Sequence, residues 1–316
     1  MNNSLKKVLI VGGSSLVGKG MINYFEQNKQ NKHANNFDLF CSIKKTWNYP
    51  FPTEKTFQMD LLSRIEIQRT LENIRPDIVV FAASEGRVDV CENNKDDAKK
   101  INVESLKDFL EILNTIKKPE LFIYISSNAV FSGENAPYSE EDHLSPVNYY
   151  GKTKVDAENV VTEMSKGYYV IIRPILLIGM AIAGRRKSAI EFFLERLHNG
   201  DEVRAVDDVF CNPLHANFLA AAIWDVIAHR DICKEQIFHI GGKDRLSRYD
   251  LVLALCKSFN LNEKLVVRSS ASEFSNLTQR AADTTYATNK ASMMLNWHPP
   301  DIYESLELLK KEWMQW

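Results

Sequence analysis

A tyrosine and a lysine four residues apart are the first candidates for chemistry in this 316-residue sequence. Tyr150 and Lys154 would share one face of a helix, because side chains at i and i+4 are neighbours there. A phenol titrates near 10 in water, and a nearby ammonium favours the phenolate. At about 4 Å and an effective dielectric of about 20, the attraction is about 4 kcal/mol before solvation losses. We therefore predict a phenol that exchanges a proton with a carbonyl or an alcohol while a hydride moves.

The spacing of this pair is not decisive by itself, because Tyr286 and Lys290 are also four residues apart. Tyr150, however, follows an apolar run, Leu121–Ile125, which ends in Ser126-Ser127. A serine at the end of a buried strand can donate a hydrogen bond to a reacting oxygen. Tyr286 has no such strand before it, and we interpret its spacing as a coincidence.

A glycine-rich turn, Gly12-Gly13-Ser14-Ser15-Leu16-Val17-Gly18, directly follows the first apolar run, Val8–Val11. Such a turn presents backbone N–H groups at a helix N-terminus, where they bind a pyrophosphate. We therefore expect a bound dinucleotide. Ser15 occupies the middle position, where it adds a side chain close to the expected pyrophosphate. Its hydroxyl is expected either to cap the helix or to bind phosphate, or else to weaken the binding of the cofactor.

The choice of dinucleotide depends on the residues around the second apolar run, Leu39–Ile43. Asp38 has the nominal spacing for an acid that binds the adenosine ribose, but it precedes the run and should lie at the wrong end of the strand. Lys44 and Lys45 follow the run, and basic residues there accept a 2′-phosphate. The sequence favours NADPH, with NADH as the alternative.

Alternating apolar runs and helical periods indicate the elements that position these residues. Further runs occur at 78–82 and 169–172, and apolar residues spaced by three and four predict a helix over 101–116. Runs without alternation suggest a parallel sheet covered on both faces, hence an α/β fold of the Rossmann-type, doubly wound kind. We predict a dinucleotide-binding domain over 1–173, completed near 214–235. A smaller mixed α/β substrate lobe over 174–316 has helical periods at 216–228, 248–259 and 302–313.

Composition excludes several other classes of protein. A formal net charge of −2 provides no basic field for nucleic acid. The five cysteines are widely spaced, which argues against a disulfide framework, and the histidines show no paired spacing for a metal. No apolar stretch approaches the length of a membrane helix. We expect a cytoplasmic protein without a metal. The basic run Arg185-Arg186-Lys187 is expected to be a solvated loop or a contact to a substrate phosphate.

Together these residues resemble the extended short-chain dehydrogenase/reductases, in particular the dTDP-4-dehydrorhamnose reductase-like branch. The resemblance covers nearly the whole chain. Its motifs are the glycine turn, Met59-Asp60-Leu61, Phe81-Ala82-Ala83-Ser84, Val88–Glu92 with Ile101-Asn102-Val103, Ser126–Phe131, the Tyr150 motif, Asp207–Phe210, Ser247-Arg248-Tyr249, Arg280–Lys290 and Trp297-His298-Pro299.

The resemblance implies roles for individual residues. It implies a catalytic set of Ser127, Tyr150 and Lys154. The implied cofactor-binding residues are Gly12, Ser14, Ser15, Leu16, Val17, Gly18, Lys44, Lys45, Asp60, Leu61, Ala82, Ala83, Ser84, Ser126, Tyr150, Lys154, Pro174 and Ile175. The implied substrate-binding residues are Arg87, Val88, Ser127, Asn128 and Arg280.

The leading hypothesis is reduction of a 4-keto sugar nucleotide by NAD(P)H. Asn128 stands where the branch usually carries an acid, and the absence of an Asp-Glu pair there argues against a dehydratase. A sugar nucleotide epimerase is one alternative. Another is a non-catalytic, dinucleotide-binding regulatory subunit, because the stretch from Arg87 to Asn102 also resembles the β subunit of methionine adenosyltransferase. The helix over 101–116 could in addition build a homodimer, as it often does in this superfamily.

Overall fold

A seven-stranded parallel sheet forms the centre of the molecule in the computed structural model, which describes residues 5–29, 36–45, 51–182, 187–274 and 278–315. The strand order is β11-β6-β5-β4-β1-β2-β3. The strands are β1 (Lys6–Val11), β2 (Phe37–Ile43), β3 (Thr56–Gln58), β4 (Ile78–Phe81), β5 (Leu121–Ile125), β6 (Tyr169–Pro174) and β11 (Gln236–Ile240). The prediction of a Rossmann-type doubly wound sheet is confirmed.

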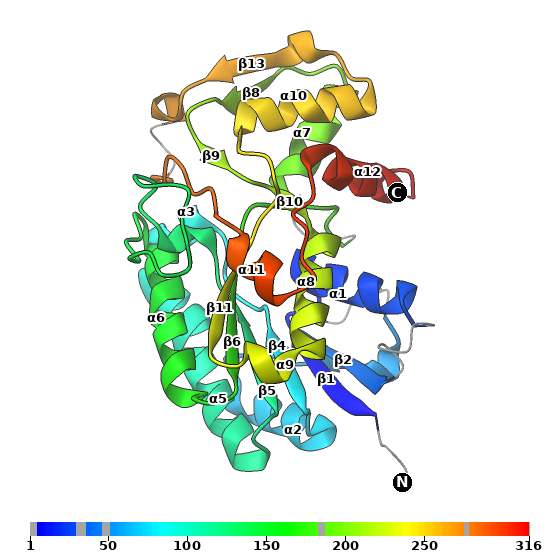
Figure 1. Ribbon diagram of the computed structural model, residues 1–316, viewed down its shortest axis with the longest axis vertical. Helices are drawn as coiled ribbons and strands as arrows, with labels where there is room; N and C mark the ends of the chain where they lie inside the picture. The colour runs from blue at the N-terminus through cyan, green and yellow to red at the C-terminus, as the bar shows by residue number, and fades with distance from the viewer. Residues whose placement is uncertain (1–4, 30–35, 46–50, 183–186, 275–277, 316) are drawn as a thin grey trace.

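Helices cover both faces of this sheet (Figure 1). On one face, α1 (Leu16–Gln27) packs against α8 (Ala216–Ala228). The other face carries α2 (Arg64–Ile74), α5 (Ser105–Ile116) and α6 (Tyr149–Met164). Side chains alternate along the strands, so Val8 and Ile10 belong to one apolar core and Leu9 and Val11 to the other. Burial on both faces explains why the strands read as uninterrupted apolar runs.

The segment after β4 contains a local departure from the predicted helix over 101–116. Short helices α3 (Val88–Asn93) and α4 (Lys95–Lys99) lead into a π-helical turn, η3 (Lys100–Glu104), before α5 begins. The amide of Asn102 is buried in this turn, where it donates to Glu85 O (3.1 Å) and Thr153 Oγ1 (3.0 Å) and accepts from Glu85 N (2.7 Å). A π-helical turn inserts an extra residue into a helix, and such turns often occur at functional sites.

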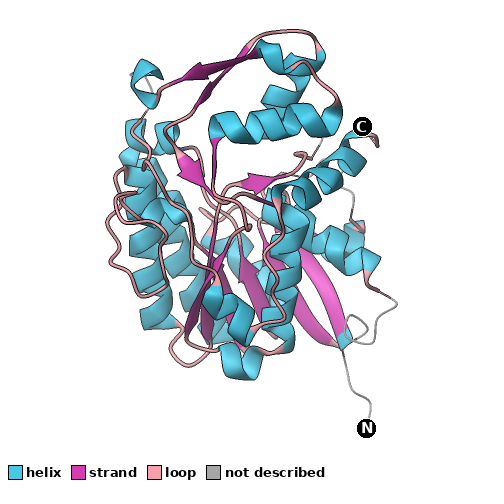
Figure 2. Ribbon diagram, turned by 45° about the horizontal axis from the view of Figure 1, so that its top comes forward, coloured by secondary structure: helices cyan, strands magenta, loops and turns pink. Residues whose placement is uncertain are grey.

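A smaller lobe lies beyond the carboxyl ends of the strands (Figure 2). It contains its own apolar core, formed mainly by α7 (Ala189–His198), α10 (Arg248–Phe259), α12 (Ile302–Trp313), β8 (Val203–Val206) and β13 (Val266–Ser269). Two short strand pairs connect it to the sheet: β7 (Leu177–Ile178) with β10 (Leu214–His215), and β9 (Phe210–Cys211) with β12 (Leu246–Ser247). The remaining helices are α9 (Arg230–Cys233), α11 (Asn289–Met294) and the 3₁₀ turns η2 (Thr53–Lys55), η4 (Asn128–Val130), η5 (Glu263–Leu265) and η6 (Ala271–Phe274).

The helices predicted over 216–228, 248–259 and 302–313 have the same bounds in the structure. Capping boxes begin α10 at Ser247 with Asp250, and α12 at Asp301 with Glu304. The segment expected to complete the first domain, 214–235, provides α8, and the chain then adds β11 to the sheet beside β6. The division of the chain into two domains remains a prediction.

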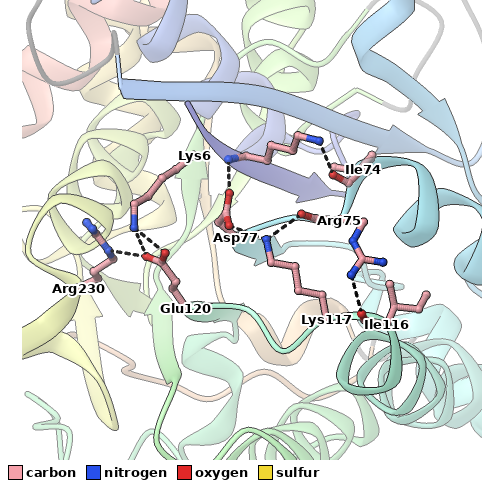
Figure 3. Close-up of polar contacts among 9 residues, drawn as sticks. Lys6, Ile74, Arg75, Asp77, Ile116, Lys117, Glu120 and Arg230 are labelled. Carbon is pink, nitrogen blue, oxygen red and sulfur yellow. Dashed lines mark hydrogen bonds and ion pairs between the residues drawn. The ribbon is translucent and has the colours of Figure 1, made fainter. Parts of the chain in front are cut away.

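A polar network joins the loops at the amino ends of the strands (Figure 3), at the opposite end of the sheet from the small lobe (Figure 1). Asp77 accepts from Lys7 N (2.8 Å) and Lys117 Nζ (2.6 Å). Nearby, Glu120 pairs with Lys6 (2.6 Å) and Arg230 (3.2 Å). Since no functional residue is expected here, the network is interpreted as structural.

The five cysteines are all buried as free thiols, in β2, α3, β9, α9 and α10. Among the described residues, no helix has the length and apolar character needed to cross a membrane.

Candidate active site

A cavity of about 710 Å³ opens at the carboxyl ends of β1, β2 and β4. Ten of the residues predicted to bind cofactor line it: Gly12, Ser14, Ser15, Leu16, Lys44, Asp60, Leu61, Ala82, Ala83 and Ser84. Arg87, predicted to bind substrate, lines it as well. The sequence interpretation missed other lining residues, namely Val11, Ser42, Leu62, Glu85, Ile101 and Ala181. Val11 and Ser42 could have been inferred from their place at the strand ends.

The glycine turn is shaped by close backbone contacts. Gly12 has φ +93°, and a Cβ there would lie 2.8 Å from Ala83 N. A Cβ at Gly18 would lie 2.5 Å from Gly13 O, so the helix can approach the strand only without a side chain. Both positions therefore require glycine. The outer side of the turn faces the cavity.

Ser15 is the N-cap of α1. Its hydroxyl accepts from Gly18 N (3.0 Å) and donates to Gly12 O (2.8 Å). Of the roles considered for this side chain, the structure shows helix capping. The hydroxyl supplies an acceptor for one of the N–H groups that have no partner within the first turn of a helix.

The lysines after β2 differ in their surroundings. Lys44 lines the cavity and forms an ion pair with Asp60 (3.1 Å), whereas Lys45 is exposed and does not line the cavity. Burial raises the pKa of Asp60, but hydrogen bonds from Leu62 N–H and Lys44, with the charge of Lys44, lower it below its usual value. Asp38 lies near the start of β2 and pairs with Lys55 (2.6 Å), at the end of the strand away from the cavity.

The predicted catalytic residues lie together. Ser127 follows β5, and Tyr150 lies in the first turn of α6, which is capped by Asn148. The Ser127 side chain lies close enough to the Tyr150 phenol to lower its pKa, while its hydroxyl donates to Asn128 Oδ1 (3.3 Å) and accepts from Ala129 N (3.1 Å). Gly151 permits this approach, because a Cβ there would lie 2.1 Å from Ala129 O. Lys154 follows one turn later, with Nζ 5.9 Å from the centre of the Tyr150 ring.

Lys154 does not lower the pKa of Tyr150 as we expected. Its Nζ donates to Ile125 O (2.9 Å) and to the buried Tyr124 hydroxyl (3.2 Å). Burial raises the pKa of Tyr150 to about 12, although the hydrogen bond from Ser127 acts in the opposite direction. Burial also lowers the pKa of Lys154 to about 8, against the charge of Glu158, which raises it. Desolvation is therefore the largest effect on the pKa of both groups.

The Ser126 hydroxyl is engaged within the protein, and its predicted contact with the cofactor remains a prediction. Its hydroxyl donates to Glu158 Oε1 (2.5 Å), and the same carboxylate forms a bidentate ion pair with Arg173 (2.7 and 2.9 Å). Arg173 also contacts His239 Nε2 (3.3 Å). All four side chains are buried, so this network fixes α6 to the sheet from inside the molecule.

The other predicted residues, the Ser127–Tyr150–Lys154 set among them, do not line this cavity. Val17 and Gly18 are buried in α1, and Pro174 and Ile175 are buried at the end of β6. Val88, the first residue of α3, is half-buried.

The predicted substrate-binding side chains are engaged within the protein. Arg87 forms an ion pair with Glu85. Asn128 Nδ2 donates to Thr284 Oγ1 (2.6 Å), and Arg280 pairs with Asp89 (2.9 Å). These contacts join the segment around 280–284 to α3 and η4.

Two further patterns have no part in this site. Tyr286 is stacked on His239 (ring centres 3.9 Å apart), while Lys290 lies near Glu141 (3.8 Å), so this second pair has no joint role. Arg185 and Arg186 lie outside the described residues, and Lys187 forms an ion pair with Glu195 (2.6 Å). No cluster of potential metal ligands occurs in the described part of the chain.

Known proteins resemble the chain over most of its length. The β subunit of methionine adenosyltransferase 2 from Pongo abelii is 29% identical over 259 residues, covering 81% of this chain and 73% of that protein. A dTDP-4-dehydrorhamnose reductase from Bacillus anthracis, solved in complex with NADP, has a TM-score of 0.80 at 21% identity, covering 98% of this chain and 100% of that one. A UDP-glucose 4-epimerase from Thermotoga maritima, solved with UDP-glucose, has a TM-score of 0.80 at 17% identity, covering 98% and 99%.

The model of the RmlD substrate binding domain family matches residues 6–314. The match includes the glycine turn, the Ser127–Tyr150–Lys154 set and the small lobe. The predicted resemblance to the dTDP-4-dehydrorhamnose reductase-like branch of the extended short-chain dehydrogenase/reductases is confirmed, and the chain belongs to the RmlD substrate binding domain family.

Proposed function

We propose that this protein is an NAD(P)H-dependent reductase of a 4-keto sugar nucleotide. The observation that carries the proposal is the placement of Ser127 beside the Tyr150 phenol, with Lys154 one turn further along α6. Membership of the RmlD family supports the substrate class. A serine, a tyrosine and a lysine held together in this way can orient a carbonyl and deliver a proton to it.

The cavity fits a dinucleotide on its own geometry. The glycine turn lines the cavity through Gly12, Ser14 and Ser15, and α1 has no acidic residue in its first turn to repel a pyrophosphate. The glycine turn would hold the pyrophosphate, and Asp60 and Leu61 would contact the adenosine half. Lys44 and Lys45 favour NADPH. NADH is the alternative, because the charge of Lys44 is already paired with Asp60.

The residues of the chain would share the work of reduction. The reduced nicotinamide ring would supply the hydride to the carbonyl carbon. The Ser127 hydroxyl would orient the carbonyl oxygen, and the Tyr150 phenol would give its proton to that oxygen as negative charge develops there. A pKa of about 12 keeps Tyr150 protonated at neutral pH, which suits a proton donor. Lys154 would bind the nicotinamide ribose and favour the phenolate left behind.

The test is oxidation of NADPH and of NADH by the purified protein with a panel of 4-keto-6-deoxy sugar nucleotides. We expect Tyr150→Phe to lower turnover by at least about 100-fold, the usual contribution of a positioned proton donor. The variant should bind dinucleotide as the wild type does. Tyr149→Phe is the matched control and should retain activity. Equal turnover by wild type and Tyr150→Phe would contradict the assigned role of the phenol.

Two other functions have specific support. The relative at 29% identity is a subunit of methionine adenosyltransferase 2, so a dinucleotide-binding regulatory subunit is the second candidate. It predicts dinucleotide binding without turnover, together with a copurifying synthetase-like partner. An epimerase, the activity named for a structural neighbour, would interconvert sugar nucleotides without net consumption of NADPH. NADPH oxidation therefore separates the reductase from both alternatives, and interconversion of sugar nucleotides without NADPH consumption separates the epimerase from the regulatory subunit.

A further inference from the structure

Glu312, in the last turn of α12, binds three segments that are distant in sequence. Its Oε2 accepts from Met180 N (2.7 Å), and its Oε1 forms an ion pair with Lys19 Nζ (3.0 Å). The side chain is only 15% exposed. These partners belong to the loop after β7 and to α1, so one carboxylate joins the C-terminal helix to the helix that follows the glycine turn.

His215 is the third partner, with Nε2 3.5 Å from Glu312 Oε2. Its other ring nitrogen, Nδ1, accepts from Asn217 N (3.2 Å). The ring proton must therefore be on Nε2, which faces the carboxylate. Nε2 faces the carboxylate but completes no hydrogen bond with it among the described residues.

The peptide group of Met180 is held from both sides. Its N–H is bound by Glu312, and its carbonyl oxygen accepts from Lys19 Nζ (2.8 Å). Ser188 Oγ, at the start of α7, donates to the preceding carbonyl, Gly179 O (3.1 Å). The loop over 179–181 is thereby fixed by α1, α7 and α12 at once.

This loop forms part of the wall of the dinucleotide cleft. Ala181, the residue after Met180, lines the cavity, and so does Leu16 at the start of α1. A Cβ at Gly179 would lie 3.5 Å from the Leu16 side chain, which shows how closely the loop and the helix approach. Displacement of Met180 would therefore alter the cavity wall directly.

The electrostatics of the cluster are consistent with a permanent contact. Burial raises the pKa of Glu312, but His215, Lys19 and the Met180 N–H together lower it to about 2. The carboxylate is therefore ionised throughout the neutral range. Its replacement by an amide would leave Lys19, with 17% of its side chain exposed, without its counter-charge.

We propose that Glu312 is a positioning residue for the dinucleotide site, and that the C-terminal helix thereby sets the affinity for the cofactor by holding the loop over 179–181 against α1. This inference rests on the proposed binding of a dinucleotide in the cleft. It assigns no role to Glu312 in the chemical step.

The test compares wild type, Glu312→Gln and Glu307→Gln in titrations with NADPH, with thermal unfolding measured in parallel. Glu307 is an exposed residue on the same helix and provides the matched control. We expect Glu312→Gln to weaken NADPH binding about tenfold. This is the loss expected if the loop over 179–181 adopts its wild-type position about one tenth of the time in the variant. The turnover rate at saturating NADPH should stay unchanged, because Tyr150 is unaffected. Glu307→Gln should bind as the wild type does.

Hydrogen exchange of the free proteins separates the possible failures. Faster exchange over 177–181 in Glu312→Gln, together with weaker binding, supports the proposal. Normal exchange, or normal NADPH affinity, in a folded variant overturns it and leaves the proposed function intact. If the wild type binds no dinucleotide, the proposed function fails and the inference fails with it. If Glu312→Gln does not fold, Lys19→Met removes the opposite side of the same contact and is judged by the same outcomes.

Discussion

Lys154 is buried, and burial brings the pKa of its ammonium close to physiological pH. Burial lowers its pKa to about 8, and Glu158, one turn away on α6, limits that decrease. The ammonium is therefore present below about pH 8 and is lost as the pH rises above it. The affinity of a ligand that accepts a hydrogen bond from this group should therefore depend on pH.

We predict that the affinity for NADPH falls about tenfold as the pH rises from 7 to 9.5, since a hydrogen bond to a charged group contributes about 1.5–3 kcal/mol. Lys154→Met should bind more weakly at pH 7 and show a flat profile. The exposed Lys152, on the same helix, supplies the control variant Lys152→Met, which should keep the wild-type profile. Fluorescence titrations at a series of pH values provide the measurement, and a flat wild-type profile would count against this assignment.

At this scale the residue types in the site could be predicted from the sequence, but the direction of their side chains could not. Ser126 and Ser127 are adjacent and chemically identical, yet Ser126 donates to the buried Glu158, whereas Ser127 donates to Asn128 and lies beside Tyr150. Successive residues of an extended segment point to opposite faces, and only the position of α6 decides which face holds the phenol. The Lys154 contact to Tyr124 depends on the same tertiary placement.

Secondary-structure elements were predictable where local signals agree with burial. The helices α8, α10 and α12 begin and end as predicted, because their apolar periods coincide with caps or with breaks in the pattern. The π-helical turn over 100–104 was not predictable. It arises from the hydrogen bonds of Asn102 to Glu85 and Thr153, which come from other elements.

The two ends of the parallel strands should respond differently to substitution. Asp77 holds the amino end of the sheet: burial raises its pKa, but hydrogen bonds from Lys117 and Lys7 N–H lower it below its usual value. We predict that Asp77→Ala lowers the free energy of unfolding by about 1–2 kcal/mol, because Lys7 N–H loses its acceptor and Lys117 its counter-charge. NADPH affinity should not change.

Urea denaturation and NADPH titration of the same preparations would test this prediction. Asp231→Ala is the control, because that carboxylate is 87% exposed and lies 3.7 Å from its partner Lys234. Its effect should be below about 0.5 kcal/mol. A loss of NADPH affinity in Asp77→Ala without a loss of stability would contradict the assignment of this end of the sheet to stability.

On the scale of the whole molecule, the cleft is built from segments that the chain brings together from far apart. The glycine turn, the strand ends and the loop after β4 all follow from a doubly wound sheet, so they could be placed from the sequence. Ala181 could not, because no local pattern indicates that the chain returns to α1 after β6. Its position depends on Lys19 and on Glu312 near the end of the chain.

The possible homodimer also belongs to this scale. None of the large hydrophobic side chains that are exposed in the described residues lies on α5 or α6. The outward side chains of α5 include Lys107 and Asn114 instead. The homodimer expected from the helix over 101–116 therefore remains a prediction, and light scattering of the purified protein would measure its mass directly.

The buried cysteines have a practical consequence for the study of motion in this protein. Cys41 and Cys91 lie in the sheet domain near the cleft, whereas Cys256 lies in the small lobe, and burial raises the pKa of Cys91 and Cys256 to about 11. A thiol reagent can react with them only when the surrounding structure opens. Labelling rates, read site by site, would therefore time the opening of each lobe separately. We predict that NADPH slows labelling at Cys41 and Cys91 more than at Cys256, and equal slowing at all three would show that the two lobes open as one unit.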